Sequence, residues 1–313
     1  MTHTGHWGAI LAGGEGQRLR DYTRILTGDD RPKQFCKLFG RQTLLEETRA
    51  RVFHSVAPAR TLYVVSRSHE PYYRSTFADT NPALVVEQPC NRGTAAAVAY
   101  ALTRIRQLEG DGVIGFFPAD HYYRDPVVLH RTVAAAYALA DTRPDSVILL
   151  GAQACRPETE YDWIETGAAL SAWRQPSGPS LIARAVTRFS EKPGLDQARD
   201  LLKRQCLWNT FVSIGRVGAF EALMADTVPS LWGRFAPVRA ARTPEEDAEM
   251  AQALYADIGT RDFSRDVLAA RPERLAVLPL PESGWTDLGQ ASRVLEVLSP
   301  PPAMISETER VAG

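Results

Sequence analysis

The chain has 313 residues, of which 44% are hydrophobic and 23% charged, and its formal net charge is −1. These values are ordinary for a globular protein, and the length suffices for one large α/β domain or two small ones. A near-neutral chain offers no extended basic surface, so nucleic acid is not expected among its partners.

Short apolar runs and helical patterns alternate through the first half of the chain. The apolar runs predict strands at 7–11, 61–65, 83–86, 113–117 and 146–150. Helical spacing predicts helices at 44–56, 94–108 and 127–140. Alternation of this kind implies an α/β fold in which a mostly parallel sheet carries helices on both faces.

The second half of the chain is less regular. It predicts strands at 181–189 and 275–278, and helices at 195–205, 217–223, 245–255 and 291–298. No internal repeat or low-complexity linker divides the sequence, so we expect one domain over residues 1–298. The tail 299–313, which opens with a run of three prolines, is expected to fray.

Two features bear on the cellular compartment. The polar start is followed by an apolar run too short for a signal peptide, and no stretch approaches the ~20 apolar residues of a membrane-spanning helix. None of the four cysteines lies within four residues of another, which argues against a zinc knuckle or a disulfide framework. We therefore expect a cytoplasmic protein with reduced thiols and no membrane partner.

A glycine-rich segment follows the first predicted strand. Gly13, Gly14 and Gly16 let the backbone turn tightly and present bare N–H groups to an anion or a base. The segment fails the dinucleotide-binding fingerprint because Leu19 stands where the third glycine would be, and no Gly-Lys-Ser/Thr follows to make a Walker motif. Taken alone, the turn is compatible with anion binding or with a purely structural role.

Two cationic residues accompany this loop. Arg18 lies just past the glycines, where a guanidinium can hold triphosphate oxygens in a bidentate manner. Lys33, within Arg31-Pro-Lys-Gln-Phe35, offers a compact positive charge for phosphate. The alternative for each residue is an ordinary solvated surface charge.

Together, segments 11–19 and 31–35 resemble the signature of the sugar-phosphate nucleotidyltransferases, most closely that of the mannose-1-phosphate guanylyltransferases. That family carries a Leu-Ala-Gly-Gly loop ending in Arg-Leu, followed by Pro-Lys-Gln-Phe. The resemblance continues nearly to the C-terminus. It implies a Rossmann-like, GT-A-like mixed sheet, with a nucleotide-binding half near residues 1–150 and a sugar-phosphate half near residues 151–298.

The resemblance assigns nucleotide binding to the glycine loop and to segment 87–95. Gln88 occupies the base-reading position, where its amide can accept from a ring N–H and donate to a ring carbonyl. Similar guanylyltransferases usually carry glutamate there, whereas glutamine also suits uracil or thymine. The expected nucleotide-binding residues are Leu11, Ala12, Gly13, Gly14, Gly16, Gln88, Gly93 and Thr94.

Two aspartates are the candidate metal ligands. Asp120 follows a buried strand, at the carboxyl edge where ligands bind in open α/β sheets, and Asp287 lies in Gly284-Trp-Thr-Asp-Leu-Gly289. By resemblance to the family, both would hold Mg²⁺, a hard ion that keeps several waters and shares phosphate oxygens. A turn cap is the structural alternative for Asp120. His121 is expected to pack or to support its neighbours rather than to catalyse.

Three further segments resemble the family's sugar-phosphate motifs. Phe189-Ser-Glu-Lys-Pro193 would place Glu191 on sugar hydroxyls and Lys192 on the sugar phosphate. The other two segments are Tyr161-Asp-Trp-Ile-Glu165 and Trp208-Asn-Thr-Phe211. The expected sugar-phosphate-binding residues are Asp162, Glu165, Glu191, Lys192 and Asn209.

Two residues in these motifs depart from the family pattern. Asp162 and Phe211 stand where similar guanylyltransferases carry glycine. If both side chains face the pocket, mannose 1-phosphate is expected to be a poor substrate and a differently shaped polyol phosphate a better one. If the local backbone has shifted, both side chains point away and the substitutions have little effect.

The resemblance implies an in-line transfer with Mg²⁺ as cofactor, in which a sugar-phosphate oxygen attacks the α-phosphorus of a nucleoside triphosphate and pyrophosphate leaves. GTP and mannose 1-phosphate are the expected substrates, and the expected catalytic residues are Arg18, Lys33, Asp120 and Lys192. Another hexose or cyclitol 1-phosphate stays open as acceptor, as does a non-catalytic homologue that binds nucleotide sugar. A homodimer also stays open.

Overall fold

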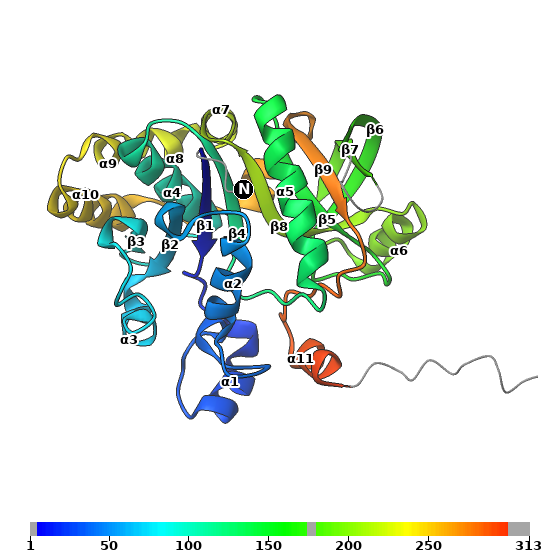
Figure 1. Cartoon of the computed structure of the whole chain (residues 1–313), viewed down its shortest axis with the longest axis horizontal. Helices are drawn as coiled ribbons and strands as arrows, with labels where there is room; N and C mark the ends of the chain where they lie inside the picture. The colour runs from blue at the N-terminus through cyan, green and yellow to red at the C-terminus, as the bar shows by residue number, and fades with distance from the viewer. Residues whose placement is uncertain (1–4, 174–179, 300–313) are drawn as a thin grey trace, which may run out of the picture.

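The computed structural model describes residues 5–173 and 180–299, so the predicted tail lies outside the described residues except for Ser299. A nine-stranded sheet forms the centre of the molecule (Figure 1). Its strands, in spatial order, are β3 (Val85–Gln88), β2 (Thr61–Ser66), β1 (His6–Leu11), β4 (Val113–Pro118), β8 (Leu207–Arg216), β5 (Val147–Gln153), β9 (Leu275–Leu280), β7 (Leu181–Ser190) and β6 (Trp163–Trp173).

The sheet is mixed but mostly parallel. β3, β2, β1 and β4 pair in parallel, and β5 pairs in parallel with β9. β8 runs antiparallel between β4 and β5, and β7 runs antiparallel between β9 and β6. Among the described strands, seven therefore point one way and only β7 and β8 point the other way, which confirms the predicted α/β class.

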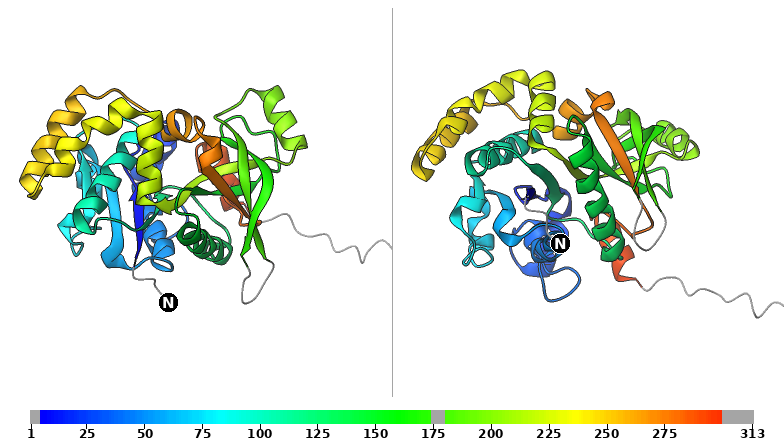
Figure 2. Two further views of the ribbon diagram at one scale, coloured as in Figure 1. Left: turned by 90° about the horizontal axis from the view of Figure 1, so that it is seen from above. Right: turned by 45° about the horizontal axis from the view of Figure 1, so that its top comes forward.

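Helices cover both faces of the sheet (Figure 2). One hydrophobic cluster lies under the helices α2 (Leu44–Phe53) and α5 (Pro126–Thr142). A larger cluster lies under α4 (Thr94–Leu108), α7 (Val217–Thr227), α8 (Pro229–Arg234) and α10 (Pro244–Asp257). β1 serves both clusters, since Ala9 packs into the larger one and Ile10 into the smaller one. Burial on both faces explains why the parallel strands read as continuous apolar runs.

Seven of the described helices lie close to the predicted ranges: α2 (Leu44–Phe53), α4 (Thr94–Leu108), α5 (Pro126–Thr142), α6 (Leu195–Lys203), α7 (Val217–Thr227), α10 (Pro244–Asp257) and α11 (Ala291–Leu298). The others are α1 (Arg20–Thr27), α3 (Glu70–Tyr73), α8 (Pro229–Arg234) and α9 (Ala236–Ala240).

Local chemistry explains several helix starts. Thr43 and Glu46 form a reciprocal capping box at the start of α2. Asp125 accepts two backbone N–H groups at the start of α5, where Pro126 takes the first helical position. Each cap satisfies amides that the first turn leaves without partners.

Two strands of the second half were not predicted. β8 is buried almost from end to end, so it shows no alternation of polar and apolar residues. β6 is long and half exposed, with register shifts against β7 that interrupt its pattern. The four helices α1, α3, α8 and α9 were also missed. The strand predicted at 83–86 begins at Val85, because Pro82–Leu84 forms a 3₁₀ turn.

A bulge in β8 shapes the middle of the sheet. The pairing of β5 with β8 shifts between Leu149 and Gly151, opposite Thr210 and Phe211. Phe211 adopts φ +65°, a left-handed conformation that favours glycine. The Asn209 side chain accepts the Phe211 N–H at 3.1 Å and so stabilises the bend.

All four cysteines are unpaired: Cys36 and Cys206 are buried, and Cys90 and Cys155 are exposed. Within residues 5–173 and 180–299, no helix combines the length and the apolarity needed to cross a bilayer.

A buried polar network attaches α10 to α4. Asp247, only 5% exposed, accepts hydrogen bonds from Tyr100 (2.6 Å) and Arg104 (2.7 Å).

We expect Asp247→Ala to lower the free energy of unfolding by about 3 kcal/mol, because it leaves the mostly buried guanidinium of Arg104 without its counter-charge. Chemical denaturation measures the change. Asp200→Ala, which removes an exposed ion pair with Lys203, is the control and should change stability by less than about 0.5 kcal/mol. Equal effects of the two variants would contradict this account of α10 docking.

Candidate functional site

Two adjoining cavities lie beyond the carboxyl ends of the parallel strands. The first, of about 270 Å³, is lined by the glycine-loop end, Lys33, Asp120 and the backbone at 288–289. The second, of about 180 Å³, is lined by residues from the second half of the chain together with Asp287. Arg18 lines both cavities, so the two cavities meet at this side chain.

Gln34 holds the glycine loop in place through side-chain hydrogen bonds. The Gln34 amide donates to the carbonyl oxygens of Ala12 (2.9 Å) and Gly14 (2.8 Å). Gly16 has φ +61°, and its backbone packs against the start of the Lys33–Phe35 turn. The turn and the loop therefore form one unit, which carries Lys33 into the first cavity.

A short backbone bridge brings the two predicted metal ligands to the same place. Tyr122 and Thr286 exchange backbone hydrogen bonds of 2.9 and 3.1 Å. Asp120 lies two residues before one partner, and Asp287 lies directly after the other. This pairing joins the end of β4 to the loop before α11, across 164 residues of sequence.

Lys33 lies between these segments. Its ammonium is 3.2 Å from Asp120 Oδ2 and donates to the carbonyl oxygen of Asp287 at 2.5 Å. The side chain is 7% exposed, so it is not a solvated surface charge. Lys33 contacts both aspartate segments and also borders the cavity where a phosphate could lie.

Asp287 is surrounded by cations. Its Oδ1 accepts from Arg293 at 2.5 Å and from the Gly289 N–H at 2.8 Å, and its Oδ2 lies 3.4 Å from Arg18. Burial alone would raise the pKa of Asp287, but Lys33 and Arg293 outweigh it and lower the pKa below its usual value. The carboxylate is therefore ionised at neutral pH and keeps one oxygen toward the cavities.

The arrangement fits a hard divalent cation. Asp120 and Asp287 each border a cavity, and Mg²⁺ in proteins commonly uses one or two carboxylates, with water and substrate phosphate completing its shell. Among the residues that the structure describes, no group of three or more His, Cys, Asp or Glu side chains is placed to hold a metal ion, so a cation here would depend on water and phosphate for most of its ligands.

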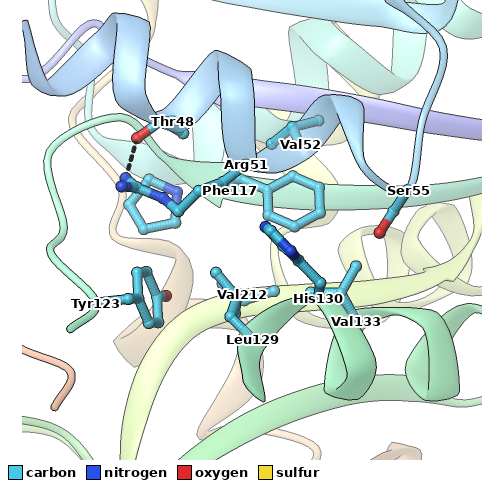
Figure 3. A pocket seen from close by; sticks show the side chains of 11 residues that line it. Thr48, Arg51, Val52, Ser55, Phe117, Tyr123, Leu129, His130, Val133 and Val212 are labelled. Carbon is cyan, nitrogen blue, oxygen red and sulfur yellow. Dashed lines mark hydrogen bonds between the residues drawn. The ribbon is translucent and has the colours of Figure 1, made fainter. Parts of the chain in front are cut away.

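The loop that carries Asp120 is supported from behind by α2 (Figure 3). Arg51 donates to Thr48 Oγ1 at 2.6 Å and to the carbonyl oxygen of His121 at 2.9 Å, and Thr48 donates to the Ala119 carbonyl at 3.3 Å. A small pocket beside Arg51, of about 20 Å³, has room for about one water molecule. Arg51 and Thr48 thus hold the backbone on both sides of Asp120.

His121 is half-buried beside this loop. Its Nδ1 accepts from the Trp285 indole at 3.2 Å, and burial lowers the pKa of His121 to about 4. The imidazole is therefore neutral near pH 7, in keeping with the packing role expected from the sequence.

The second cavity gathers most of the predicted sugar-site residues. Four of them line it: Asp162, Glu191, Lys192 and Asn209. Glu165 does not, and its carboxylate instead pairs with Arg204, the residue after α6, at 2.5 Å. The structure therefore separates Glu165 from the other members of the predicted set.

Both residues that depart from the family pattern line the cavity. Burial raises the pKa of Asp162 to about 6, and its Oδ1 is buried without a hydrogen-bond partner among the described residues. Phe211 packs partly against the core, with its ring 6.3 Å from that of Phe263, yet it also borders the cavity. A phenyl ring at φ +65° carries backbone strain that glycine would avoid.

The predicted base-binding residues lie away from both cavities. Gln88 is 3% exposed, its Oε1 accepts from Tyr255 at 3.2 Å, and its amide nitrogen is so close to Gly13 that a Cβ there would come within 2.5 Å. Thr94 Oγ1 accepts the N–H of Phe263 at 2.8 Å. Gly93, at φ +82°, packs against the backbone of Arg261 with no room for a Cβ.

Several cavity residues were not predicted from the sequence. Glu160 receives the Arg18 guanidinium at 2.6 Å, and Asp262 and Ser264 line the sugar cavity from the segment after α10. Glu160 lies one residue before a recognised motif, which could have drawn attention to it. The irregular segment 261–264 carries no comparable signal, because only the tertiary fold brings it to the cavity.

Comparison with solved structures supports the architecture. A crystal structure from Thermus thermophilus, described as a mannose-1-phosphate geranyltransferase, matches with a TM-score of 0.80 and 26% identity over 96% of this chain and 81% of that one. A UDP-glucose pyrophosphorylase in complex with UDP-glucose shares the fold, with a TM-score of 0.54 and 14% identity. Both comparisons support the α/β fold with its mixed, mostly parallel sheet.

The sequence comparisons define the family. Residues 7–299 match the nucleotidyl transferase family model, and the chain belongs to that family. It is 29% identical over 297 residues to the alginate biosynthesis protein AlgA of Pseudomonas syringae pv. tomato, covering 92% of this chain and 57% of the relative. It is 26% identical to mannose-1-phosphate guanylyltransferase ManC of Salmonella typhimurium, covering 96% and 61%. The chain thus spans less than two thirds of the length of these curated relatives.

We expect Asp120→Asn and Asp287→Asn each to reduce turnover by at least about 100-fold, because each removes charge from the predicted cation site. Their stabilities should differ. Asp287→Asn should lower the Tm more, since Arg293 loses a buried counter-charge, whereas in Asp120→Asn the Lys33 ammonium keeps its hydrogen bond to the Asp287 carbonyl oxygen. Steady-state rates at limiting Mg²⁺ and thermal unfolding test both statements. Near-normal turnover of either variant would remove that residue from the site.

The raised pKa of Asp162 predicts a pH-dependent stability. The folded chain retains the proton up to about pH 6, whereas the unfolded chain loses it near the ordinary value of 3.8, so stability falls as the pH rises through this window. The loss can reach about 3 kcal/mol. Asp162→Asn should lack this component. Denaturant unfolding of both proteins between about pH 4 and pH 7 measures it, and parallel pH profiles for the two chains would show that Asp162 titrates normally.

Proposed function

We propose that this chain transfers a nucleotidyl group from a nucleoside triphosphate to a sugar 1-phosphate and releases pyrophosphate. The observation that carries the proposal is the junction of the two cavities, where Arg18, Lys33, Asp120 and Asp287 come together beside a polar pocket that contains Lys192. Membership of the nucleotidyl transferase family supports the reaction class.

The proposed chemistry is an in-line displacement. A phosphate oxygen of the sugar 1-phosphate is already ionised, so it needs no protein base to attack the α-phosphorus. The bond from the α-phosphorus to the β-phosphate bridging oxygen breaks as the new P–O bond forms, and pyrophosphate leaves. Arg18 and Lys33 hold the triphosphate and Lys192 holds the incoming phosphate, so the protein acts by positioning and charge neutralisation.

We propose Mg²⁺ as the cofactor, with Asp120 and Asp287 as its protein ligands. When bound there, the ion would neutralise phosphate charge and orient the two phosphate groups. The two carboxylates suit it because each borders a cavity and Asp287 is kept ionised by its neighbours.

GTP and mannose 1-phosphate are the proposed substrates. The support is the mannose-1-phosphate guanylyltransferases among the relatives, at 25–26% identity. A second candidate acceptor, another hexose or a cyclitol 1-phosphate, is favoured by one observation: Asp162 and Phe211 both border the sugar cavity. The cytoplasmic location and the homodimer stay predictions of the sequence.

A pyrophosphate-release screen tests the reaction class. Nucleoside triphosphates are combined with sugar 1-phosphates, and release with one defined pair is the expected result. Thermal stabilisation by nucleotide sugar without release from any pair would instead indicate a non-catalytic binding protein.

We expect Lys192→Ala to raise the KM for sugar 1-phosphate by roughly 30- to 150-fold, the effect of losing a charge-assisted contact worth about 2–3 kcal/mol. The KM for the nucleotide should change little, because Lys192 lines the second cavity and not the first. Lys203→Ala, at an exposed position on α6, is the matched control. An equal rise in both KM values would place Lys192 elsewhere in the reaction.

The acceptor is decided by specificity constants measured with GTP across a panel of hexose and cyclitol 1-phosphates. If mannose 1-phosphate is the substrate, it should rank first, with kcat/KM near ~10⁴ M⁻¹s⁻¹ or above. A higher constant for another polyol phosphate would support the second candidate. In that case Asp162→Gly should shift the ranking toward mannose 1-phosphate.

A further inference from the structure

Arg293 is a buried arginine that the proposed chemistry does not use. It lies on α11 and is 2% exposed. Its Nη1 donates to Asp287 Oδ1 at 2.5 Å, its Nη2 lies 3.0 Å from Glu158 Oε2, and its guanidinium lies over the Tyr161 ring at 4.3 Å. A guanidinium so deeply buried requires such partners, because an unpaired charge there would be costly.

The first contact fixes the orientation of Asp287. Arg293 and the Gly289 N–H together occupy Oδ1, so the carboxylate cannot rotate freely. Oδ2 is left facing the cavities, where its contact in the described part of the chain is Arg18 at 3.4 Å. Asp287 therefore presents a single, defined oxygen to a cation.

The other contacts fix the loop at the entrance of the sugar cavity. Glu158 Oε1 accepts the backbone N–H of Glu160 at 3.1 Å, and the Glu158 carbonyl accepts from the Trp163 indole at 2.8 Å. Tyr161 also lies 3.2 Å from the Thr286 hydroxyl. This loop carries Glu160, the partner of Arg18, and leads directly into Asp162 of the cavity wall.

We propose that Arg293 is a positioning residue that couples the sugar loop 158–161 to the cation-binding carboxylate of Asp287, so that the docking of α11 assembles both ends of the site. Residues Leu288 and Val294 anchor α11 in a cluster with Leu19 of the glycine-loop segment, which ties the same helix to the nucleotide half. The inference rests on the proposed function for its ligands but concerns the geometry of this chain.

The test is the binding of Mn²⁺, a spectroscopic substitute for Mg²⁺, to the folded protein without substrates, measured by electron paramagnetic resonance. We expect Arg293→Met to weaken binding by about 10-fold or more, as loss of a partner that orients a ligand does. The direction of the change in Mn²⁺ affinity distinguishes a positioning role from a purely electrostatic one. If Arg293 acted only through its charge, removing this cation would strengthen Mn²⁺ binding, because like charges repel.

Three variants complete the experiment. Arg293→Lys keeps a positive charge, so it is a control for the case in which Arg293→Met fails to fold. A lysine ammonium cannot donate to two carboxylates with the fixed geometry of a guanidinium, so this variant should also weaken Mn²⁺ binding. Glu158→Gln weakens only the contact between Arg293 and the loop 158–161. It should raise the KM for sugar 1-phosphate by roughly 2- to 30-fold and leave the Mn²⁺ affinity unchanged. Arg156→Met is the control, because Arg156 also contacts Glu158 but does not touch Asp287.

Unchanged or tighter Mn²⁺ binding by folded Arg293→Met or Arg293→Lys overturns the proposal, as does a wild-type chain that binds no Mn²⁺. A wild-type chain that binds Mn²⁺ but releases no pyrophosphate contradicts the proposed function instead. The two failures are therefore separable.

Discussion

Two backbone hydrogen bonds between Tyr122 and Thr286 are the constraint on which the candidate site depends. They hold the end of β4 against the loop before α11, and so place two aspartates that are 167 residues apart in the sequence around Lys33. A parallel sheet directs its strand ends to one edge, but this bridge selects which loops meet there. The cavities, their shared Arg18 and the support from α2 are built around that junction.

Charge balance is the second theme of the site. Asp287 is flanked by Arg18, Lys33 and Arg293, and Lys33 and Arg293 lower the pKa of this largely buried carboxylate. Asp162, on the wall of the sugar cavity, has a raised pKa and a buried oxygen with no hydrogen-bond partner in the described part of the chain. The two aspartates thus have opposite pKa shifts, because nearby cations outweigh burial at Asp287, whereas burial outweighs the effect of Lys192 at Asp162.

The sugar half departs most from the family pattern, and the structure gives the physical reason. The bulge in β8 requires a left-handed conformation at residue 211, which a glycine adopts without strain and Phe211 adopts at a cost. The ring is supported by contact with the core, so the strain is offset by packing. The left-handed backbone is therefore compatible with Phe211, whose ring also borders the second cavity.

The sequence alone determined the class of fold and most of the elements, because strands buried on both faces and amphipathic helices leave strong periodic patterns. Local motifs also drew attention to the glycine loop, Lys33 and both aspartates, and the structure brings Lys33 into contact with both aspartate segments. The sequence-based prediction missed β8, whose burial removes alternation, and it grouped Glu165 with a cavity that this side chain does not border. Arg293, Glu160 and Asp262 became visible only in three dimensions, since their partners are distant in sequence and chain-neighbour patterns cannot encode such contacts.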